Sequence, residues 1–529
     1  MKFPKYIIAT AIIILLGAVA IFIFKTKNRN GSQPLFKLLS SKETNIDFSN
    51  NIVDSESRNV LNYEYFYNGG GVAVGDINND GLEDIFFTSN SGENKLYLNL
   101  GHMKFKDITK EACPELIGRK GGWKTGVTMA DVNGDGLLDI YVCYSGNVDS
   151  NLRRNQLFIN QGNLKFKEEA KQYGLDDPGY STQAAFFDYD NDGDLDMFLL
   201  NHNIKKMDNN EIASFRKGVD PYAGDKLFEN QNGHFIDVTA KAGIHQFPLT
   251  FGLGVAISDI NQDGWQDIYV TNDYNEPDYV YINNHDGTFT EKSGDYFTHE
   301  SQSSMGVDIA DFNNDGLPDI ITLDMLPEDN YRQKVLQVPD NYDNFQFMVN
   351  QGVEKQYMRN MLQLNNGDGT FSEIGQLAGV SKTDWSWSPL FADFDNDGFK
   401  DLFITNGYLR DYTNKDFLRY WGDYKIKQAM NREPVNLFDL VRAMPVSKYP
   451  NYIFRNNHDL TFSNEQKQWG FDQPKNSNGA VYADLDNDGD LDLVVNNLNE
   501  ESGIDKNMSR ENDHTSYLDH KLKYKGGNV

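Results

Sequence analysis

The stretch that decides the fold of this chain is DINNDGLED, residues 76–84, because close relatives of it return six more times. All seven copies fit the pattern D-x-[ND]-x-D-G-x-x-D, and they recur at intervals of 52 to 91 residues. Self-similarity of this kind is the sequence signature of a repeat architecture. The copies begin at Asp76, Asp131, Asp188, Asp259, Asp311, Asp393 and Asp484.

The residues on either side of each copy predict strands. A short apolar run such as GVAVG (71–75) precedes the loop, and a β-branched or aromatic run such as IFFTSN (85–90) follows it. Two more strands joined by an Asn/Gly turn come next, as in KLYLNLGHMKFKDIT (95–109). Each unit is therefore expected to hold four antiparallel strands, with the acidic loop joining the first to the second. About seven such units predict an all-β fold, a seven-bladed β-propeller of four-stranded antiparallel blades.

The two ends of the chain indicate how this propeller closes. The last unit lacks a fourth strand, and LFKLLSSKETNIDF (35–48) has the pattern of one, directly before the first unit. We expect this N-terminal strand to complete the seventh blade. Three long insertions between second and third strands cover 201–225, 325–358 and 407–450, and the spacing in the last of them predicts small helices.

Bulk properties narrow the possible classes of function. The formal net charge of −29 over 529 residues argues against nucleic-acid binding, because phosphate contacts need a basic surface. The 28 Tyr, 34 Phe and 6 Trp supply apolar area for a core, so an acidic disordered chain is not expected. The two cysteines, Cys113 and Cys143, are interpreted as separate buried thiols, with a single bridge between them as the alternative.

The N-terminal residues predict a membrane segment. Residues 6–24 form a run of nineteen uncharged residues, about the length that spans a bilayer. An uncleaved anchor is the favoured interpretation, and a signal peptide cleaved near residues 18–20 is the alternative. The chain is therefore expected to be membrane-anchored outside the cytoplasm, in the periplasm or at the cell surface, or secreted if the segment is cleaved. The predicted domains are 1–33, the anchor or signal segment with its linker; 34–507, the propeller; and 508–529, the start of a C-terminal region.

The repeated loop has the chemistry of a calcium site. Side-chain oxygens stand at positions 1, 3, 5 and 9 of the pattern, and a backbone carbonyl is available at position 7. Glycine at position 6 permits the positive φ that turns the chain around an ion. An EF-hand is excluded, since its last acid stands at position 12 between helices, and zinc is disfavoured because no His or Cys takes part. The alternative is a set of Asn/Asp/Gly turns without a metal.

We therefore predict up to seven structural Ca²⁺ ions, each held by four side chains. The predicted ligands are Asp76, Asn78, Asp80 and Asp84; Asp131, Asn133, Asp135 and Asp139; Asp188, Asp190, Asp192 and Asp196; Asp259, Asn261, Asp263 and Asp267; Asp311, Asn313, Asp315 and Asp319; Asp393, Asp395, Asp397 and Asp401; and Asp484, Asp486, Asp488 and Asp492.

The stretch GGGVAVGDINNDGLEDIFF (69–87), followed by LYLN (96–99), resembles the FG-GAP/VCBS repeat found in the integrin α propeller. The insertions DMLPEDNYRQK (324–334) and ITNGYLRDYTNKDFLRYWGDYK (404–425) look like those of Bacteroidetes-type envelope proteins. The tail from residue 517 is similar to the opening of an ASPIC/UnbV-type domain, which would continue beyond this chain. The resemblance implies a calcium-stabilised extracytoplasmic protein for adhesion or ligand binding. Integrins carry calcium loops in only some blades, whereas all seven units match here, which favours a structural role for the metal.

If the acidic loops lie at one face of the propeller, the three insertions lie at the other. Aromatic residues expected there suit stacking on a glycan or anchoring of a protein ligand, and packing beneath neighbouring loops is the alternative. The candidates are Trp123, Tyr180, Phe247, Trp385 and Trp387.

A carbohydrate-active enzyme, either a polysaccharide lyase or a hydrolase, is the alternative function. The chain contains no G-x-S-x-G, H-E-x-x-H or P-loop motif, so we name no catalytic residue. His245 and His299 are the only histidines expected near this face.

Overall fold

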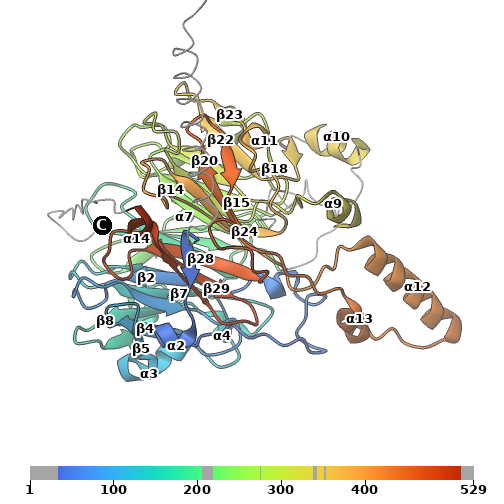
Figure 1. The fold of residues 1–529 in the computed structure, drawn as a ribbon, viewed down its shortest axis with the longest axis horizontal. Coiled ribbons are helices and arrows are strands. Elements are labelled where there is room, and N and C mark those ends of the chain that lie inside the picture. Colours follow the sequence, from blue (N-terminus) through green and yellow to red (C-terminus); the bar gives the residue numbers. More distant parts are fainter. Residues whose placement is uncertain are drawn as a thin grey trace, which may run out of the picture.

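The computed structural model describes residues 34–204, 218–248, 250–273, 276–336, 342–350 and 353–513, and its architecture is all-β (Figure 1). Seven four-stranded sheets follow one another along the chain, and each has its strands in the order of the sequence except for one strand of the last sheet. All pairings within these seven sheets are antiparallel, as the repeated units predict. We number the sheets 1 to 7, and we give the acidic loop of each sheet the same number.

The strands have the following bounds. Sheet 1 contains β2 (Val72–Gly75), β3 (Asp84–Phe87), β4 (Lys95–Asn99) and β5 (Phe105–Asp107). Sheet 2 contains β6 (Trp123–Ala130), β7 (Asp139–Ser145), β8 (Gln156–Asn160) and β9 (Phe166–Glu168). Sheet 3 contains β10 (Ser181–Phe187), β11 (Asp196–Asn201), β12 (Lys226–Asn230) and β13 (Phe235–Asp237). Sheet 4 contains β14 (Gly252–Ser258), β15 (Asp267–Asn272), β16 (Tyr279–Asn283) and β17 (Phe289–Glu291).

Sheet 5 contains β19 (Val307–Ala310), β20 (Asp319–Thr322), β22 (Met361–Asn365) and β23 (Phe371–Glu373). Sheet 6 contains β24 (Ser386–Ala392), β25 (Asp401–Asn406), β26 (Tyr452–Asn456) and β27 (Phe462–Asn464). Sheet 7 contains β28 (Ser477–Ala483), β29 (Asp492–Asn497), β30 (Gly503–Asn507) and β1 (Phe36–Leu38). A separate parallel pair joins β18 (Glu300–Ser301) to β21 (Gln356–Tyr357).

The N-terminal strand joins the last sheet, as its sequence pattern predicts. β1 pairs antiparallel with β30, so strands from the two ends of the described chain lie side by side (Figure 1, blue and red). Each outer strand begins with a phenylalanine opposite the asparagine that ends the third strand, and Phe36 opposite Asn507 continues this register. The strand is shorter than the predicted stretch, because the short helix α2 (Ser41–Thr44) follows it.

Each second strand is buried along its whole length, which explains its continuous apolar and β-branched sequence. The reason is that every sheet is covered on both faces by its neighbours. A separate apolar cluster fills each space between consecutive sheets, for example Phe86 of sheet 1 with Ile140 of sheet 2. One such cluster also packs sheet 7 against sheet 1, with Val494 beside Phe87.

Helices occur in the connections between strands. The 325–358 insertion contains α9 (Asn330–Leu336) and α10 (Tyr342–Asn350). The 407–450 insertion contains α12 (Lys415–Asn431) and α13 (Leu437–Ala443), as predicted, and α12 extends away from the sheets (Figure 1). The remaining helical segments are η1 (Glu64–Tyr67), α3 (Thr109–Ala112), η2 (Pro114–Ile117), α4 (Ser150–Arg153), α5 (Ala170–Tyr173), α7 (Thr239–Ala242), α8 (Ser293–Tyr296), α11 (Gly375–Ala378) and α14 (Ser509–Asp513).

Several sequence predictions concern the ends of the chain. The apolar segment 6–24 and most of the C-terminal region lie outside the described residues. Among the residues that are described, no helix is both long and apolar enough to cross a membrane. Cys113 and Cys143 are both buried and unbridged, in agreement with the preferred interpretation.

Candidate metal-binding loops and the aromatic face

Hydrogen bonds to its own backbone fold each acidic loop. In loop 1, Asp76 Oδ1 accepts from the Asp80 N–H at 3.0 Å and Oδ2 accepts from the Gly81 N–H at 2.7 Å. Asp80 Oδ1 in turn accepts from the Leu82 N–H at 3.0 Å. Gly81 has a φ of +85°, so glycine at position 6 is needed for this turn. All three hydrogen bonds recur in each of the other six loops.

The aspartate at position 9 anchors the loop to the sheet. In loop 1, Asp84 Oδ2 accepts from the Ile77 N–H at 3.1 Å, and Oδ1 accepts from the Asn99 N–H at 2.7 Å. Burial, together with the nearby charges of Asp80 and Asp76, raises the pKa of Asp84 to about 7. Burial raises the pKa at this position in every loop: to about 6 at Asp267, about 7 at Asp139 and Asp319, about 8 at Asp196 and Asp401, and well above the ordinary value at Asp492. A cation in the loop would favour the charged form of these groups.

An asparagine ends each third strand and in six of the seven sheets ties neighbouring loops together, a role that the sequence reasoning missed. Asn99 Nδ2 donates to the Glu83 carbonyl of its own loop at 3.0 Å and to the Leu485 carbonyl of loop 7 at 2.8 Å. A link of this kind to the preceding loop is present in six of the seven sheets. The signal in the sequence is the final residue of LYLN, LFIN, LFEN, VYIN, LQLN, IFRN and IDKN. These asparagines are Asn99, Asn160, Asn230, Asn283, Asn365, Asn456 and Asn507.

A second link runs to the following loop from position 4. Asn79 Nδ2 donates to the Gly136 carbonyl of loop 2 at 2.9 Å, and Asn487 Nδ2 of loop 7 donates to the Gly81 carbonyl of loop 1 at 2.9 Å. Similar links from Gln262, Asn314 and Asn396 join loops 4 to 5, 5 to 6 and 6 to 7. Loops 7 and 1 are therefore connected in both directions, although more than 400 residues separate them in sequence.

The donor set fits a hard cation. In loops 3, 6 and 7, one carboxylate oxygen from each of three aspartates lies within 4.8 Å of the others, and Asp488, Asp490 and Glu511 form a fourth such group beside loop 7. Several loop oxygens are buried without a hydrogen-bond partner among the described residues, which is costly unless a cation supplies one. These atoms are Asp190 Oδ1, Asp194 Oδ1, Asp319 Oδ2, Asp395 Oδ1 and Asp486 Oδ1. Carboxylate and carbonyl oxygens without His or Cys are the ligands that Ca²⁺ prefers.

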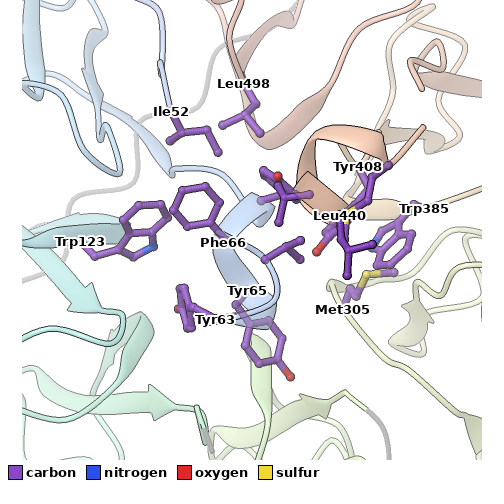
Figure 2. Packing of buried hydrophobic residues seen from close by; sticks show 14 of the residues in the cluster. Ile52, Tyr63, Tyr65, Phe66, Trp123, Met305, Trp385, Tyr408, Leu440 and Leu498 are labelled. Atoms are coloured by element: carbon purple, nitrogen blue, oxygen red, sulfur yellow. The ribbon is translucent and has the colours of Figure 1, made fainter. Parts of the chain in front are cut away.

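The opposite face is closed by an aromatic cluster rather than by repeated loops (Figure 2). Tyr63, Tyr65 and Phe66, from η1 and the residue before it, lie between Trp123 and Trp385. Trp123 stacks on Phe66 at 4.9 Å between ring centroids, and Trp385 stacks on Tyr408 at 3.9 Å. Only 4% of Trp123 and 7% of Trp385 is exposed, so these two candidates pack beneath neighbouring segments instead of standing free on the surface.

Two cavities adjoin this cluster. One, of about 310 Å³, is lined by residues from or next to the first strand of every sheet, and by Trp123 and His202. The other, of about 190 Å³, is lined mainly by aromatic side chains and by two acids. Trp387 lines both. The lining of the second cavity includes Glu64, Tyr65, Asp273, Ser303, Trp385, Trp387, Tyr408 and Tyr412.

The second cavity has polar groups among its aromatic rings. The Tyr65 hydroxyl donates to Asp273 Oδ2 at 3.1 Å, and burial raises the pKa of Asp273 to about 7. Trp387 Nε1 donates to the Gly407 carbonyl at 2.7 Å. Trp385, which forms part of the cavity wall, has its Nε1 buried without a hydrogen-bond partner among the described residues.

The other candidates of this face lie apart from the cavities. Tyr180 packs under the guanidinium of Arg153 at 4.2 Å, and Phe247 stacks on His245 at 4.7 Å. His299 contacts Glu373, with Nε2 3.3 Å from Oε2. Among the five aromatic candidates, the structure brings Trp123, Trp385 and Trp387 together at the cluster, and it places Tyr180 and Phe247 elsewhere.

Comparisons with known proteins give a family and some distant relatives. A family model described as an FG-GAP-like repeat matches residues 76–142, 143–199, 259–322, 349–404 and 437–495. Cartilage acidic protein 1 of Xenopus tropicalis is 29% identical over 244 residues, and that of Homo sapiens is 24% identical over 426 residues. These alignments cover 46% and 72% of this chain, and they span 35% and 61% of the length of the two relatives.

Two solved structures share a weaker likeness. An Agrocybe aegerita lectin that recognises non-reducing terminal N-acetylglucosamine aligns with a TM-score of 0.39 and 15% identity, covering 75% of this chain and 79% of the lectin. Bacillus licheniformis rhamnogalacturonan lyase aligns with a TM-score of 0.38 and 10% identity, covering 84% and 72% of the two chains. At these TM-scores the likeness carries no argument about the function of this chain.

Proposed function

From the premise that the chain belongs to the FG-GAP-like repeat family, we propose that it is a calcium-stabilised β-propeller that binds a ligand at the face opposite its metal loops. The seven sheets are its blades, and residues 34–507 form the propeller domain. The N-terminal segment 1–33 places this domain outside the cytoplasm, as a membrane anchor or as a cleaved signal.

Contacts between the sheets support closure of the propeller. The first strand of each sheet contacts the first strand of the next, and β28 of sheet 7 contacts β2 of sheet 1. The larger cavity is lined by residues of all seven sheets, as expected for the axis of a propeller. Pairing of β1 with β30 makes the last blade from both ends of the domain, so that opening the ring requires breaking a sheet.

Calcium is assigned to the seven acidic loops, where positions 1, 3, 5 and 9 supply the side-chain oxygens. When bound, Ca²⁺ supplies positive charge that neutralises the clustered carboxylates and connects the oxygens of one loop. The loop residues orient these oxygens through the backbone hydrogen bonds of positions 1 and 5, and the bridging asparagines hold neighbouring loops in register. Extracellular calcium is abundant enough to fill even millimolar sites of this kind.

The aromatic cavity is the observation that carries the ligand assignment. Trp385, Trp387, Tyr408 and Tyr412 surround a space that also contains the carboxylate of Asp273. Aromatic faces pack on the C–H groups of a sugar ring, while hydroxyl groups of the sugar donate to a carboxylate. The cavity of about 190 Å³ is smaller than the roughly 300–1,000 Å³ of a typical ligand pocket, and its size suits a single sugar residue at the end of a glycan. The proposed ligand is therefore a glycan, either free or carried by a protein.

A glycan array probed with the full chain, in calcium and in EGTA, tests this function. The Trp387→Ala variant removes a half-buried cavity wall, and Asp273→Asn removes the charge that receives hydroxyl groups. Phe247→Ala is the matched control, because Phe247 is also half-buried but lines neither cavity. We expect both cavity variants to lose the array signal and the control to keep it, at equal melting temperatures. An unchanged signal in both cavity variants, or no bound glycan for the wild type, contradicts the assignment, and so does release of a cleaved product.

A further inference from the structure

The seven loops differ in charge at position 3. Loops 1, 2, 4 and 5 have asparagine there, and its amide donates to the carboxylate at position 5, as in Asn78 Nδ2 to Asp80 Oδ2 at 2.9 Å. Loops 3, 6 and 7 have aspartate, which adds one carboxylate to those at positions 1, 5 and 9. Without a partner, the formal charge on these four positions is −3 in the first group and −4 in the second.

Loops 6 and 7 each receive a basic side chain from the third strand of their own sheet. Arg455 Nε lies 2.6 Å from Asp395 Oδ2, and its Nη2 lies 2.9 Å from Asp397 Oδ2. Lys506 Nζ contacts Asp486 Oδ2 and lies 2.9 Å from Asp488 Oδ2. Both residues stand directly before the bridging asparagine of β26 and β30.

In sheets whose loop has asparagine at position 3, the residue directly before the asparagine that ends the third strand is apolar. The residues there are Leu98, Ile159, Ile282 and Leu364 in sheets 1, 2, 4 and 5. A basic residue thus occurs at this position only beside a loop with the extra carboxylate, and in loops 6 and 7 it returns the local charge to that of the other loops. Charge-assisted hydrogen bonds at these distances hold the basic groups among the oxygens that would bind a metal ion.

Loop 3 has the extra carboxylate, and no basic side chain of the described residues contacts it. Glu229 occupies the position of Arg455 and Lys506, and Asp194 adds a further acid at position 7 of the loop. Asp190 Oδ1 and Asp194 Oδ1 are buried without a hydrogen-bond partner among the described residues. In contrast, Asp490 at the same position of loop 7 accepts from Asn396 Nδ2 at 2.7 Å and from the Arg510 N–H at 2.7 Å. Glu229 itself pairs with Lys241, whose Nζ lies 3.5 Å from Glu229 Oε2, but the five aspartates of loop 3 have no basic contact among the described residues, so they form the most negative set of loop oxygens there.

We propose that Arg455 and Lys506 are tethered cations that compete with calcium, so that loop 3 fills first and loops 6 and 7 fill last. This inference rests on the proposed binding of calcium by the loops. Affinity in oxygen sites follows the number of charged ligands and their freedom to reach the ion. With an arginine or lysine among the ligands, the local charge is no more negative than in loops 1, 2, 4 and 5. In addition, the basic group either has to be displaced from the oxygens or stays there and repels the incoming Ca²⁺.

A calcium titration of the full chain tests the order of filling. EGTA first removes bound metal, and native mass spectrometry and calorimetry then monitor the binding of added calcium. For the wild type we expect one ion to bind first, four to follow, and two to bind at least roughly tenfold more weakly than those four. Arg455→Met and Lys506→Met should each convert one weak site into one of the stronger class. Glu229→Lys, which places a tethered cation beside loop 3, should remove the site that fills first.

Arg442→Met is the matched control, because Arg442 is exposed on α13 and its ion pair is with Asp439 of the same helix, 3.8 Å away. It should leave all seven affinities unchanged. Arg455→Gln repeats the test with a polar side chain of similar length, so that a folding defect of the methionine variant does not decide the result. The inference is overturned if the wild type has seven sites of equal affinity. It is also overturned if neither Arg455 variant nor Lys506→Met changes the weak sites. Either result leaves the proposed binding of calcium intact. A wild type that binds no calcium overturns the proposed function as well.

Discussion

The two faces of this molecule differ in construction, since one consists of a repeated loop and the other of an irregular cluster of aromatic side chains. At the loop face, seven nine-residue loops repeat the same hydrogen bonds, and side-chain amides link six of the seven pairs of neighbouring loops. At the aromatic face, connections of different lengths meet in one irregular cluster around Tyr65 and Trp385 (Figure 2). The repeated hydrogen bonds of the loop face therefore hold neighbouring sheets together. The irregular aromatic face is where we expect a ligand-binding site that is specific to this chain.

The charges of the two faces are also handled differently. The loop face concentrates carboxylates whose mutual repulsion a cation would relieve, whether a metal ion or a side chain such as Lys506. The aromatic face has internal ion pairs between insertions, in which Arg332 of α9 lies 2.8 Å from Asp411 and also pairs with Asp384. The cation of this second network is covalently part of the chain, so this face is not expected to depend on metal in the same way.

The largest expected effect comes from removing the strand that joins the two ends of the domain. A chain lacking residues 1–48 loses β1 with the buried Phe36 and Phe48, and it exposes the apolar clusters on both sides of sheet 7. Because several buried side chains and a whole strand are lost together, we expect no cooperative unfolding transition at 25 °C. The comparison is a chain lacking only residues 1–33, followed by circular dichroism on heating. Equal melting temperatures for the two truncations would show that the loop links alone close the structure.

A somewhat smaller effect is expected at the ion pairs of the aromatic face. Arg332→Ala leaves Asp384 and Asp411 buried without their partner, which typically costs about 3–5 kcal/mol. Urea denaturation measures this cost, and Arg442→Ala, at an exposed arginine of α13, provides the control. A loss below about 1 kcal/mol would indicate that the insertions are held by packing alone.

The bridging asparagines should matter less individually. Asn99→Ala removes two hydrogen bonds donated to carbonyl groups, one of which crosses from sheet 1 to loop 7, and the one that Asn99 Oδ1 accepts from the Gly101 N–H. The free energy of unfolding is expected to fall by about 1–3 kcal/mol. Asn457→Ala is the control, since Asn457 lies in an exposed turn and bonds only locally to Thr461 and Ser463. Equal losses in the two variants would show that the link between loops adds nothing.

The smallest effect concerns pH at the aromatic face. His202 is buried, with Nε2 2.6 Å from the Ser145 hydroxyl, and burial lowers its pKa from 6.5 to about 3. Below pH 6.5 the unfolded chain binds a proton at this histidine and the folded chain does not, so this contribution to stability falls as pH falls, by at most about 1.4 kcal/mol per unit. The stability advantage of the wild type over His202→Asn should therefore shrink between pH 7 and pH 5 in urea denaturation. An advantage that stays constant or grows would contradict the neutral buried histidine.

The sequence predicts the repeated elements well because each of them depends on local rules. Glycine at position 6, acids at positions 1, 5 and 9 and apolar flanks specify loop and strands within a few residues, and the phenylalanine of FKL (36–38) matches the other outer strands. The helices of the last insertion follow from helical spacing for the same reason, although α12, with 17 residues, is longer than the short helices expected.

The features that the sequence does not predict are contacts between segments that are far apart in the sequence and lie side by side only in the fold. The link from Asn99 to Leu485 joins residues 386 apart, and nothing local distinguishes that asparagine from one in a turn. Phe66 of η1 covers Trp123, and Tyr408 of the 407–450 insertion covers Trp385, so the exposure of these two residues could not be judged from their own segments. The role of Arg455 and Lys506 appears only when the third strand is placed beside the loop of its own sheet.

The central claim is that calcium in the repeated loops stabilises the whole domain, and calorimetric melting of the full chain tests it most directly. The melts are run in a magnesium buffer, once with excess calcium and once with excess EGTA. Each site filled at a hundredfold excess over its dissociation constant adds about 2.7 kcal/mol, so we predict one transition that moves to markedly higher temperature with calcium. Superimposable transitions in calcium and EGTA would contradict the account.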